Sequence, residues 1–335
     1  MKSFQSSGPK WRTAFSTKLA KHRKRQLRRL RFEAMESRRL LATIVWDGEA
    51  GDDRWETAAN WQGNVLPSAF DDVVIDVPGQ SKSIFIESGH VTVQSIDSQE
   101  RLIVRNSGDL TIAAAFSVGI STLAAGIEVA PGRTLRASGT NTQVTIQGSS
   151  LIDGANLRVD SAARLAIPGV TNYENTSPGT FNSWVVDGSG SLLDLQNITT
   201  ITSSSSHIKQ HSISASSGGR IDLHRVTTFV DSEAGNPDGR NFAILASGTG
   251  SLVDLSALTA ILDRSPFGFG ITGTSSLQAD GGGQIVAPLL ASLSATDLVM
   301  SSPISLPSLT TFTQATIAVN GINVVMPTLT SIDGI

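Results

Sequence analysis

The most constraining feature of this chain is an internal repeat in its second half. The segments SGSLLDLQNITTI (189–201), GGRIDLHRVTTFV (218–230) and TGSLVDLSALTAIL (249–262) share a hydrophobe, an Asp, a Leu, two spacers, a hydrophobe and a Thr in the same order. A period of roughly 20 to 50 residues means that one supersecondary unit recurs, and stacked units bury a continuous core. The sequence therefore predicts a solenoid.

The repeat extends over most of the chain when it is followed by the first hydrophobe after each Gly/Ser-rich turn. These hydrophobes are separated by 25, 30, 28, 28, 32, 32, 19 and 20 residues. The two short final intervals leave a leucine-rich-repeat-like variant open, and a β-sandwich also has strands between Gly-rich turns. The hydrophobes are Leu110, Leu135, Leu165, Leu193, Ile221, Val253, Ile285, Ile304 and Val324.

The spacing of hydrophobes within one unit indicates strands that turn corners. Leu193 and Leu195 alternate with polar residues, as in a pleated strand, and the spacing then lengthens to three at Ile198 and Ile201. No 12-residue window after residue 42 combines helical periodicity with capping residues. We therefore predict an all-β fold, a parallel β-helix (β-solenoid) over residues 86–335, with rungs about 4.8 Å apart.

Charge is divided unevenly along the 335 residues. Residues 1–42 carry a net charge of +11, whereas the rest of the chain carries −14. The segment KHRKRQLRRLRFEAMESRRLLA lacks Gly and Pro, and it also lacks the apolar run of an ordinary secretory signal. We interpret residues 1–42 as a basic targeting leader, disordered or helical. The chain has no Cys, which excludes disulfides and thiolate metal sites.

A tryptophan-rich segment stands between the leader and the repeats. Trp46, Trp55 and Trp61 are three of the five tryptophans and fall within 16 positions. A solenoid needs a cap over its first rung, and clustered Trp supplies a large apolar area in few residues. We interpret residues 43–85 as an N-terminal cap. A carbohydrate platform of stacked indoles is the alternative.

Two stretches carry a resemblance to known proteins. LRFEAMESRRLLA (30–42) resembles the LEPR-XLL motif at the start of planctomycete surface and secreted proteins, and residues 42–77 resemble the opening of bacterial extracellular β-helix and autotransporter-like repeat proteins. The resemblance implies export, a surface or matrix role and a β-solenoid body, and it implies no catalytic residues. In the motif Glu36, Arg38, Leu40 and Leu41 match, while Met35 and Ser37 replace the usual Leu and Pro.

The repeat places three carboxylates at one equivalent position on successive rungs. We expect Asp194, Asp222 and Asp254 to form a row on the outside of one sheet, with a Ca²⁺ ion or a donor such as Arg220 nearby because stacked carboxylates repel. These three residues are the candidate metal site. No other cofactor is expected.

Two histidines lie close together in the sequence. His207 and His211 are four positions apart, which on a strand separates them by roughly 13 Å and is too far for one ion. We interpret them as surface histidines.

The expected function follows from the fold and the resemblance more than from any motif. No Walker loop, G-x-G-x-x-G, H-E-x-x-H or G-x-S-x-G motif occurs. The sequence favours a secreted or cell-surface structural and adhesive protein without catalytic activity of its own. The alternative is an extracellular polysaccharide lyase or hydrolase on a β-helix scaffold. A smooth Ser/Thr surface would favour adhesion, and convergent Asp, Arg and His in a groove would favour the enzyme.

The same reasoning sets the expected partners. Extracellular polysaccharide or other surface proteins fit an acidic, exported body, whereas nucleic acid does not. No run of about 18 apolar residues encodes a transmembrane helix. The segment PTLTSIDGI has no polar cap and leaves strand edges open. We therefore expect the chain to be incomplete, irregular in its last rung or joined end to end with a partner.

Deleting residues 1–42 tests the leader. We expect the deletion to abolish export and to leave the melting temperature unchanged, because the basic segment is not part of the folded body. Export is followed by fractionation and stability by thermal melts. A large fall in melting temperature with normal export would contradict the interpretation.

Overall fold

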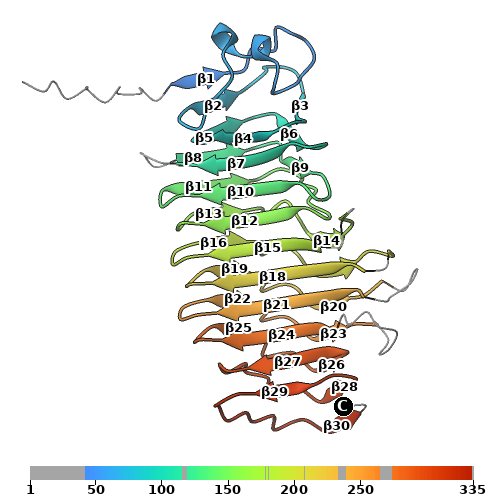
Figure 1. Ribbon diagram of the computed structural model, residues 1–335. Helices are drawn as coiled ribbons and strands as arrows, with labels where there is room; N and C mark the ends of the chain where they lie inside the picture. Colours follow the sequence, from blue (N-terminus) through green and yellow to red (C-terminus); the bar gives the residue numbers. More distant parts are fainter. Residues whose placement is uncertain are drawn as a thin grey trace, which may run out of the picture. The chain divides into compact units, whose positions relative to one another are not determined.

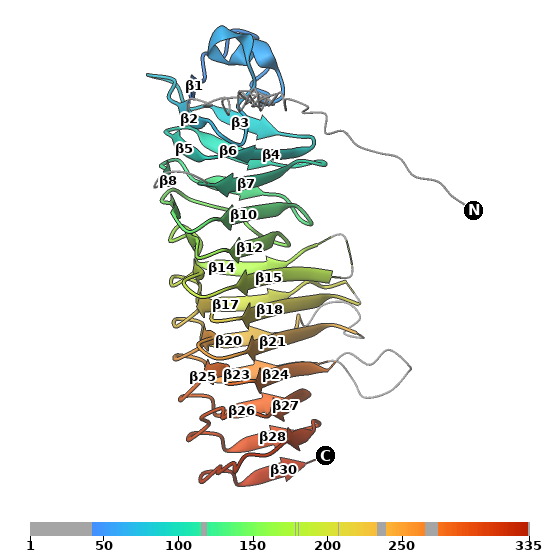
Figure 2. The same ribbon diagram turned by 60° about the vertical axis from the view of Figure 1, so that its left-hand side comes forward.

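The computed structural model describes residues 42–114, 119–177, 179, 181–206, 208–232, 239–264 and 274–333. These residues form an all-β fold of stacked parallel strands, the predicted parallel β-helix (Figures 1 and 2). The targeting leader lies outside the described residues except for Ala42, and so does His207.

Sheet 1 is ten-stranded, and its strands pair in parallel in chain order. Most of its strands are short, because the chain turns a corner soon after each one. Its members are β1 (Thr43–Val45), β2 (Asp72–Ile75), β5 (Ser95–Ser98), β8 (Gly119–Leu123), β11 (Thr142–Ile146), β13 (Arg164–Ala166), β16 (Leu192–Asp194), β19 (Arg220–Asp222), β22 (Leu252–Asp254) and β25 (Gln284–Val286).

Sheet 2 is also ten-stranded and parallel, and it contains the longest strands of the stack. Its strands alternate buried and half-buried residues over as many as seven positions. Its members are β4 (His90–Val93), β7 (Asp109–Ala113), β10 (Thr134–Ser138), β12 (Asn156–Asp160), β15 (Phe181–Asp187), β18 (Gln210–Ser216), β21 (Asn241–Ser247), β24 (Ser275–Asp280), β27 (Thr296–Met300) and β29 (Ile317–Val319).

Two further parallel sheets, sheet 3 and sheet 4, lie between sheet 1 and sheet 2 along the chain. Sheet 3 serves the early rungs and contains β3 (Ser83–Ile86), β6 (Arg101–Val104) and β9 (Ile127–Val129). Sheet 4 serves the later rungs and contains β14 (Asn172–Asn175), β17 (Thr200–Ser203), β20 (Thr228–Val230), β23 (Ala260–Leu262), β26 (Ser292–Ser294), β28 (Thr311–Thr313) and β30 (Ser331–Asp333). A rung therefore runs from sheet 1 through sheet 3 or 4 to sheet 2.

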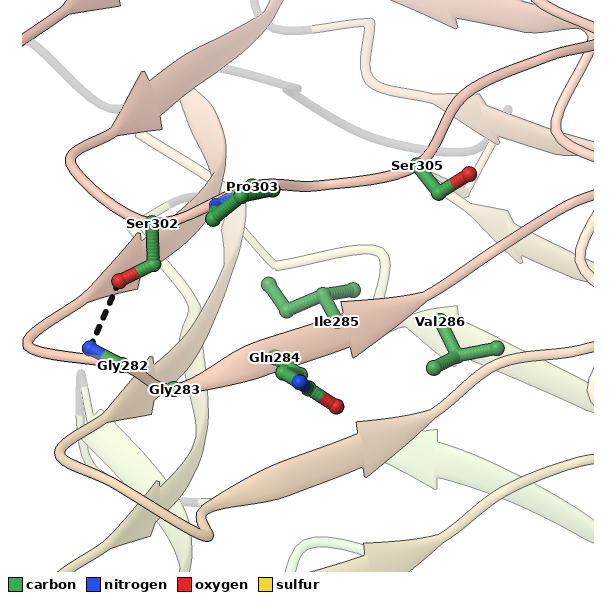
Figure 3. Close-up of a pocket in the computed structure, with 8 residues that line it drawn as sticks. All are labelled: Gly282, Gly283, Gln284, Ile285, Val286, Ser302, Pro303 and Ser305. Carbon is green, nitrogen blue, oxygen red and sulfur yellow. Dashed lines mark hydrogen bonds between the residues drawn. The ribbon is translucent and has the colours of Figure 1, made fainter. Parts of the chain in front are cut away.

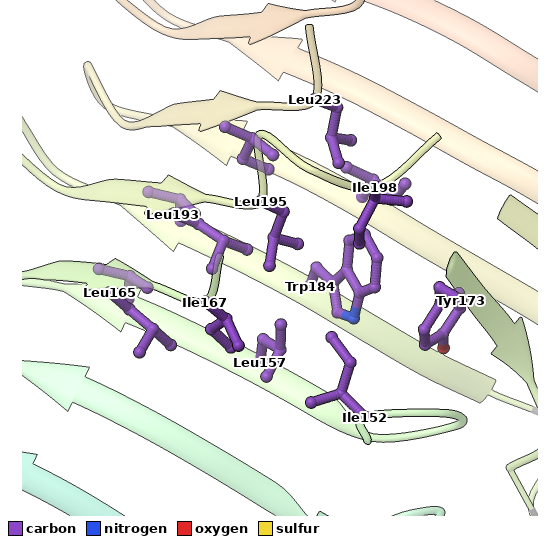
Figure 4. Packing of buried hydrophobic residues seen from close by; sticks show 14 of the residues in the cluster. Ile152, Leu157, Leu165, Ile167, Tyr173, Trp184, Leu193, Leu195, Ile198 and Leu223 are labelled. Carbon is purple, nitrogen blue, oxygen red and sulfur yellow. The ribbon is translucent and has the colours of Figure 1, made fainter. Parts of the chain in front are cut away.

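The hydrophobes used to follow the repeat point into the interior of the β-helix. Leu193, Ile221, Val253 and Ile285 are register partners on successive strands of sheet 1, and all four are buried. Figure 4 shows how neighbouring rungs interlock around the buried Trp184. The alternation predicted from the sequence is thus the inward and outward alternation of real strands.

The equivalence of the first two selected hydrophobes was wrong. Leu110 and Leu135 are buried, but they lie on β7 and β10 of sheet 2, whereas Leu165 and Leu193 lie on sheet 1. The physical reason is that Gly-containing turns precede strands at more than one corner of each rung. A hydrophobe after such a turn does not by itself identify the corner.

The step from two-residue to three-residue spacing marks a tight turn between sheets 1 and 4. The backbone N–H of Ile198 donates to the carbonyl of Leu195 at 3.0 Å, and both side chains are fully buried. The same bond joins Val226 to Leu223 at 2.9 Å in the next rung. The turn changes the direction of the chain while both hydrophobes stay inside.

A buried hydroxyl ties neighbouring rungs together at the corner between sheets 2 and 1. Ser191 Oγ donates to the carbonyl of Asp187 at 2.7 Å and accepts the backbone N–H of Ala162, in the preceding rung, at 2.9 Å. Ser251 repeats the arrangement two rungs later, accepting the N–H of Gly218 at 2.9 Å. Each hydroxyl thus bonds one carbonyl of its own rung and one backbone N–H of the preceding rung.

The tryptophans of the segment interpreted as an N-terminal cap form one buried cluster and not a carbohydrate platform. Trp46, Trp55 and Trp61 are 3%, 2% and 0% exposed, so no indole face is open to a sugar. Trp61 contacts the other two rings edge-on, with centroids 4.9 and 4.7 Å away, and its Nε1 donates to the carbonyl of Trp55 at 2.7 Å. The two short 3₁₀ helices η1 (Ala58–Asn60) and η2 (Gln62–Asn64) belong to this cap.

Truncating a corner hydrophobe tests the packing. Leu223→Ala removes a fully buried side chain between two rungs and should lower the free energy of unfolding by about 2–5 kcal/mol. Leu289→Ala is the matched control, because Leu289 is 54% exposed and its truncation should change stability little. Denaturant midpoints of the two variants provide the measurement. Equal midpoints would contradict the predicted corner.

Candidate functional site

The three candidate carboxylates form the predicted row. Asp194, Asp222 and Asp254 are register partners on β16, β19 and β22, and they alternate with inward hydrophobes that are fully or almost fully buried. The row lies on the outer face of sheet 1, as the repeat indicated. It ends at Val286, the register partner of Asp254 on β25.

Each carboxylate accepts a hydrogen bond from the backbone of its own turn. In all three residues Oδ1 accepts the backbone N–H two positions further along, at 3.3 Å for Asp194, 3.1 Å for Asp222 and 3.0 Å for Asp254. This Asx turn leads directly into the corner described above. The recurrence of Asp is therefore explained by local backbone geometry.

The arginine that contacts the row is not the one that was expected. Arg164 Nη2 donates to Asp194 Oδ2 at 2.9 Å, and the Asp194 side chain is only 9% exposed. Arg220 makes no such contact, and within the described residues its guanidinium has no hydrogen-bond or ion-pair partner.

The other two carboxylates find partners within their own turns. His224 Nδ1 lies 2.7 Å from Asp222 Oδ1, and Ser256 Oγ donates to Asp254 Oδ1. In the described part of the chain, no three His, Cys, Asp or Glu side chains are grouped so that they could hold a metal ion. A Ca²⁺ ion bridging the row stays a prediction.

A small hollow opens beside the row on the outer face of sheet 1. Its volume is about 180 Å³, and it lies where β16, β19 and β22 are neighbours. The side chains that line it combine apolar surface, one guanidinium and two carboxylates. The lining residues are Leu192, Arg220, Ile221, Asp222, Leu252 and Asp254.

A second hollow, of about 420 Å³, lies beside β25, the outermost strand of sheet 1 (Figure 3). In the described part of the chain, the next rung pairs with β25 through the bridge between Val286 and Ser305, and Pro303 contributes no backbone N–H there. Ser302 Oγ closes one end by accepting the N–H of Gly282 at 2.7 Å. No charged side chain lines this hollow, so none of its lining residues could act as a general acid or base.

The acidic residues of the cap are also engaged within the fold. Asp52 accepts hydrogen bonds from Thr57 Oγ1 and Asn60 Nδ2, both at 2.6 Å, and from the backbone N–H of Arg54. The bond from Thr57 is the largest of these effects and lowers the pKa of Asp52. Asp53 pairs with Lys82 at 2.7 Å. These acids hold cap turns in place.

A cross-rung charge cluster on sheet 2 was not recognisable from the sequence. Arg136 Nε and Nη2 reach the two oxygens of Asp160 at 2.8 and 2.9 Å, and Arg158 Nε adds a bond at 3.0 Å. Burial alone raises the pKa of Asp160, but the hydrogen bonds from Arg136, Ser138 and Arg158 outweigh it and hold the pKa well below its usual range. The cluster locks β10 to β12.

The interpretation of His211 as a surface residue was wrong. His211 is fully buried on β18 and contacts the rings of Tyr173 and Trp184, whose centroids lie 4.9 and 4.6 Å away. Among the described residues, neither ring nitrogen has a hydrogen-bond partner. The signal was present, since His211, Ile213 and Ala215 alternate with serines and share the inward face. Burial lowers the pKa of His211 to about 3.

A buried ion pair anchors the corner between sheets 4 and 2. Arg240 Nη1 lies 3.2 Å from Asp231 Oδ1, and both side chains are 1% exposed. The Arg240 guanidinium also donates to the carbonyls of Ser205, Ser206 and Ser232 at 2.7–3.0 Å. Because these bonds satisfy the guanidinium inside the fold, the pair fastens the chain at this corner.

Comparisons with protein-family models, with curated proteins and with solved structures found no match for this chain. The described residues include no helix long and apolar enough to cross a membrane.

The buried imidazole predicts a pH dependence of stability. The neutral form is favoured in the folded chain, where the pKa is about 3, and the unfolded chain takes up a proton near pH 6.5. The stabilising contribution is complete above pH 6.5 and is lost as the pH falls toward 3. His211→Phe should therefore lose less melting temperature than the wild type between pH 7 and pH 4.

Thermal melts at stepped pH provide the measurement. Ile213→Val, a buried change on the same strand that neither adds nor removes a titratable group, is the control and should lower the whole curve without changing its pH dependence. Parallel curves for His211→Phe and the wild type would show that the imidazole does not titrate between the two states.

Proposed function

We propose that this protein is a secreted or cell-surface structural and adhesive β-solenoid, without catalytic activity of its own, that binds extracellular polysaccharide or other surface proteins. The observation that carries the proposal is the outer face of sheet 4 between β17 and β28. Its ten outward residues include no charged side chain, although the body of the chain carries −14. They are Thr200, Thr202, Thr228, Val230, Ala260, Leu262, Ser292, Ser294, Thr311 and Thr313.

A ladder of threonines borders this face. Thr227 Oγ1 donates to the carbonyl of Thr199 at 3.1 Å, and Thr259 Oγ1 donates to the carbonyl of Thr227 at 3.0 Å. The hydroxyls are thereby fixed at the spacing of the rungs. A rigid, uncharged, hydroxyl-bearing surface offers many weak contacts to an extended partner, and it offers no acid and base for catalysis.

The N-terminal leader supports an extracellular location in this proposal. The LEPR-XLL-like motif, the +11 leader and the acidic body fit a planctomycete surface or secreted protein related to autotransporter-like β-helices. The negative body does not suit nucleic acid, whose phosphates are bound by clustered Lys and Arg.

The proposal includes end-to-end self-association. In the described part of the chain, β29 and β30 are the outermost strands of sheets 2 and 4. Val325, which lies between these two strands in the sequence, is 77% exposed, and Ile332 on β30 is 55% exposed. Open strand edges next to exposed hydrophobes are templates for a second chain.

An enzyme is the second candidate, and the hollow at Arg220 is the observation that favours it. Asp222 and Asp254 lie there on adjacent rungs, which are about 4.8 Å apart, close to the roughly 5 Å between the carboxyl groups of retaining glycosidases. Both carboxylates nevertheless accept hydrogen bonds from their own turns. An extracellular lyase or hydrolase therefore remains the alternative.

Binding and cleavage measured together separate the two candidates. The full chain, applied to an array of extracellular polysaccharides, should bind without releasing soluble oligosaccharides. Thr228→Glu places a charge in the middle of the uncharged face and should weaken adhesion at least fivefold without changing the melting temperature. Thr111→Glu, on the outer face of sheet 2, is the control. Released oligosaccharides would establish the enzyme, and absent binding would overturn polysaccharide as the partner.

A further inference from the structure

We propose that the hollow around Arg220 is a subsite for one residue of a neutral, hydroxyl-rich polysaccharide. This inference rests on the proposed adhesive function and adds to the face of sheet 4 a second, discrete contact on sheet 1. The hollow of about 180 Å³ is much larger than one water molecule requires and is open to solvent, so a single sugar ring can enter it.

The walls of the hollow follow from the register of three strands. Leu192, Arg220 and Leu252 are outward register partners on β16, β19 and β22, so the arginine stands between two leucines. Asp222 and Asp254 occupy the neighbouring outward column. An apolar platform thus lies beside one donor and two acceptors, which is the combination that a sugar ring requires.

Arg220 supplies the donor because the fold does not use it. Arg164, two rungs earlier in the same column, reaches across to Asp194 on the following rung at 2.9 Å. Arg220 and Asp254 stand in the same diagonal relation, but Asp254 accepts from Ser256 and not from Arg220. Within the described residues the Arg220 guanidinium keeps all its N–H groups for an external acceptor.

The two carboxylates keep one oxygen each for a ligand. The turn donors and His224 all bind the Oδ1 atoms of Asp222 and Asp254. Within the described residues, neither Oδ2 atom accepts a hydrogen bond. A vicinal diol would accept from the guanidinium and donate to these oxygens, forming charge-assisted hydrogen bonds. The C–H face of the ring would then pack on Leu192 and Leu252.

Charge favours a neutral sugar over an acidic one. The hollow contains two carboxylates against one guanidinium, so a uronate or a sulfate group would meet net negative charge. Free oxygens on neighbouring carboxylates would also attract a cation, which makes Ca²⁺ a competitor that the experiment must separate.

Titration of the full-length chain with defined sugars tests the site. The neutral probes are cellohexaose, maltohexaose and xylohexaose, the acidic probe is hexagalacturonate, and CaCl₂ alone is the cation probe. Binding is measured by isothermal titration calorimetry. At least one neutral hexaose should bind more tightly than hexagalacturonate, and Arg220→Ala should weaken that binding at least tenfold.

Control variants separate a lost contact from a lost fold. Arg220→Lys keeps the charge without the planar fork and should lie between the wild type and Arg220→Ala. Arg225→Ala removes an exposed arginine outside the hollow, whose Nη1 bonds Asn197 at 3.2 Å, and should bind like the wild type. Both Arg220 variants should keep the wild-type melting temperature, since the Arg220 side chain has no partner among the described residues. Arg225→Ala loses only one exposed hydrogen bond and should change the melting temperature little.

The outcomes distinguish this site from the function on which it rests. A wild type that binds no sugar here and no polysaccharide on the array would overturn the polysaccharide-binding function itself. Binding that is equal in Arg220→Ala and the wild type would overturn this site alone. Preference for hexagalacturonate would overturn the neutral assignment. Heat from CaCl₂ that is lost in Asp254→Asn, with no sugar binding, would replace the sugar subsite with a cation site.

Discussion

At each corner of this β-helix the chain must change direction while the hydrophobes on both sides stay inside. The turn from Leu195 to Ile198 meets this requirement with one backbone hydrogen bond, and the following rungs repeat it. Strands of three to seven residues have little stability alone. They persist because every corner returns the chain to a position where it pairs with the rung before it. The outward faces are ordered only because the corners are.

The row of aspartates illustrates how function can arise from a structural repeat. Each Asp caps its turn, so the spacing of the carboxylates along sheet 1 is fixed by the corner and not by a ligand. Where the neighbouring column places an arginine that reaches across, as at Arg164, the surface is closed by an ion pair. Where the arginine has no partner among the residues that the structure describes, as at Arg220, the same geometry leaves a lined hollow.

The sequence predicted what depends on local spacing and missed what depends on register between distant segments. The inward faces, the corners and the aspartate row all follow from residues within one repeat. The ion pair between Arg164 and Asp194 joins positions 30 residues apart. The Arg136–Asp160 cluster spans 24. To predict such a contact, the register between the two strands must be known to within one residue. The repeat intervals vary between 19 and 32 residues and do not give the register that accurately. His211 was missed because its polarity was given more weight than its alternation with Ile213.

The direction of the backbone hydrogen bonds has a mechanical consequence. In stacked parallel rungs these bonds run along the axis of the stack, so a pull applied between its ends loads the rungs in series. The rung with the weakest ladder would open first. A released rung of 28 residues, about 4.8 Å thick when stacked, would extend to about 100 Å of chain. Under force the chain would lengthen by unfolding one rung at a time, while the remaining rungs stay folded with their outer faces intact.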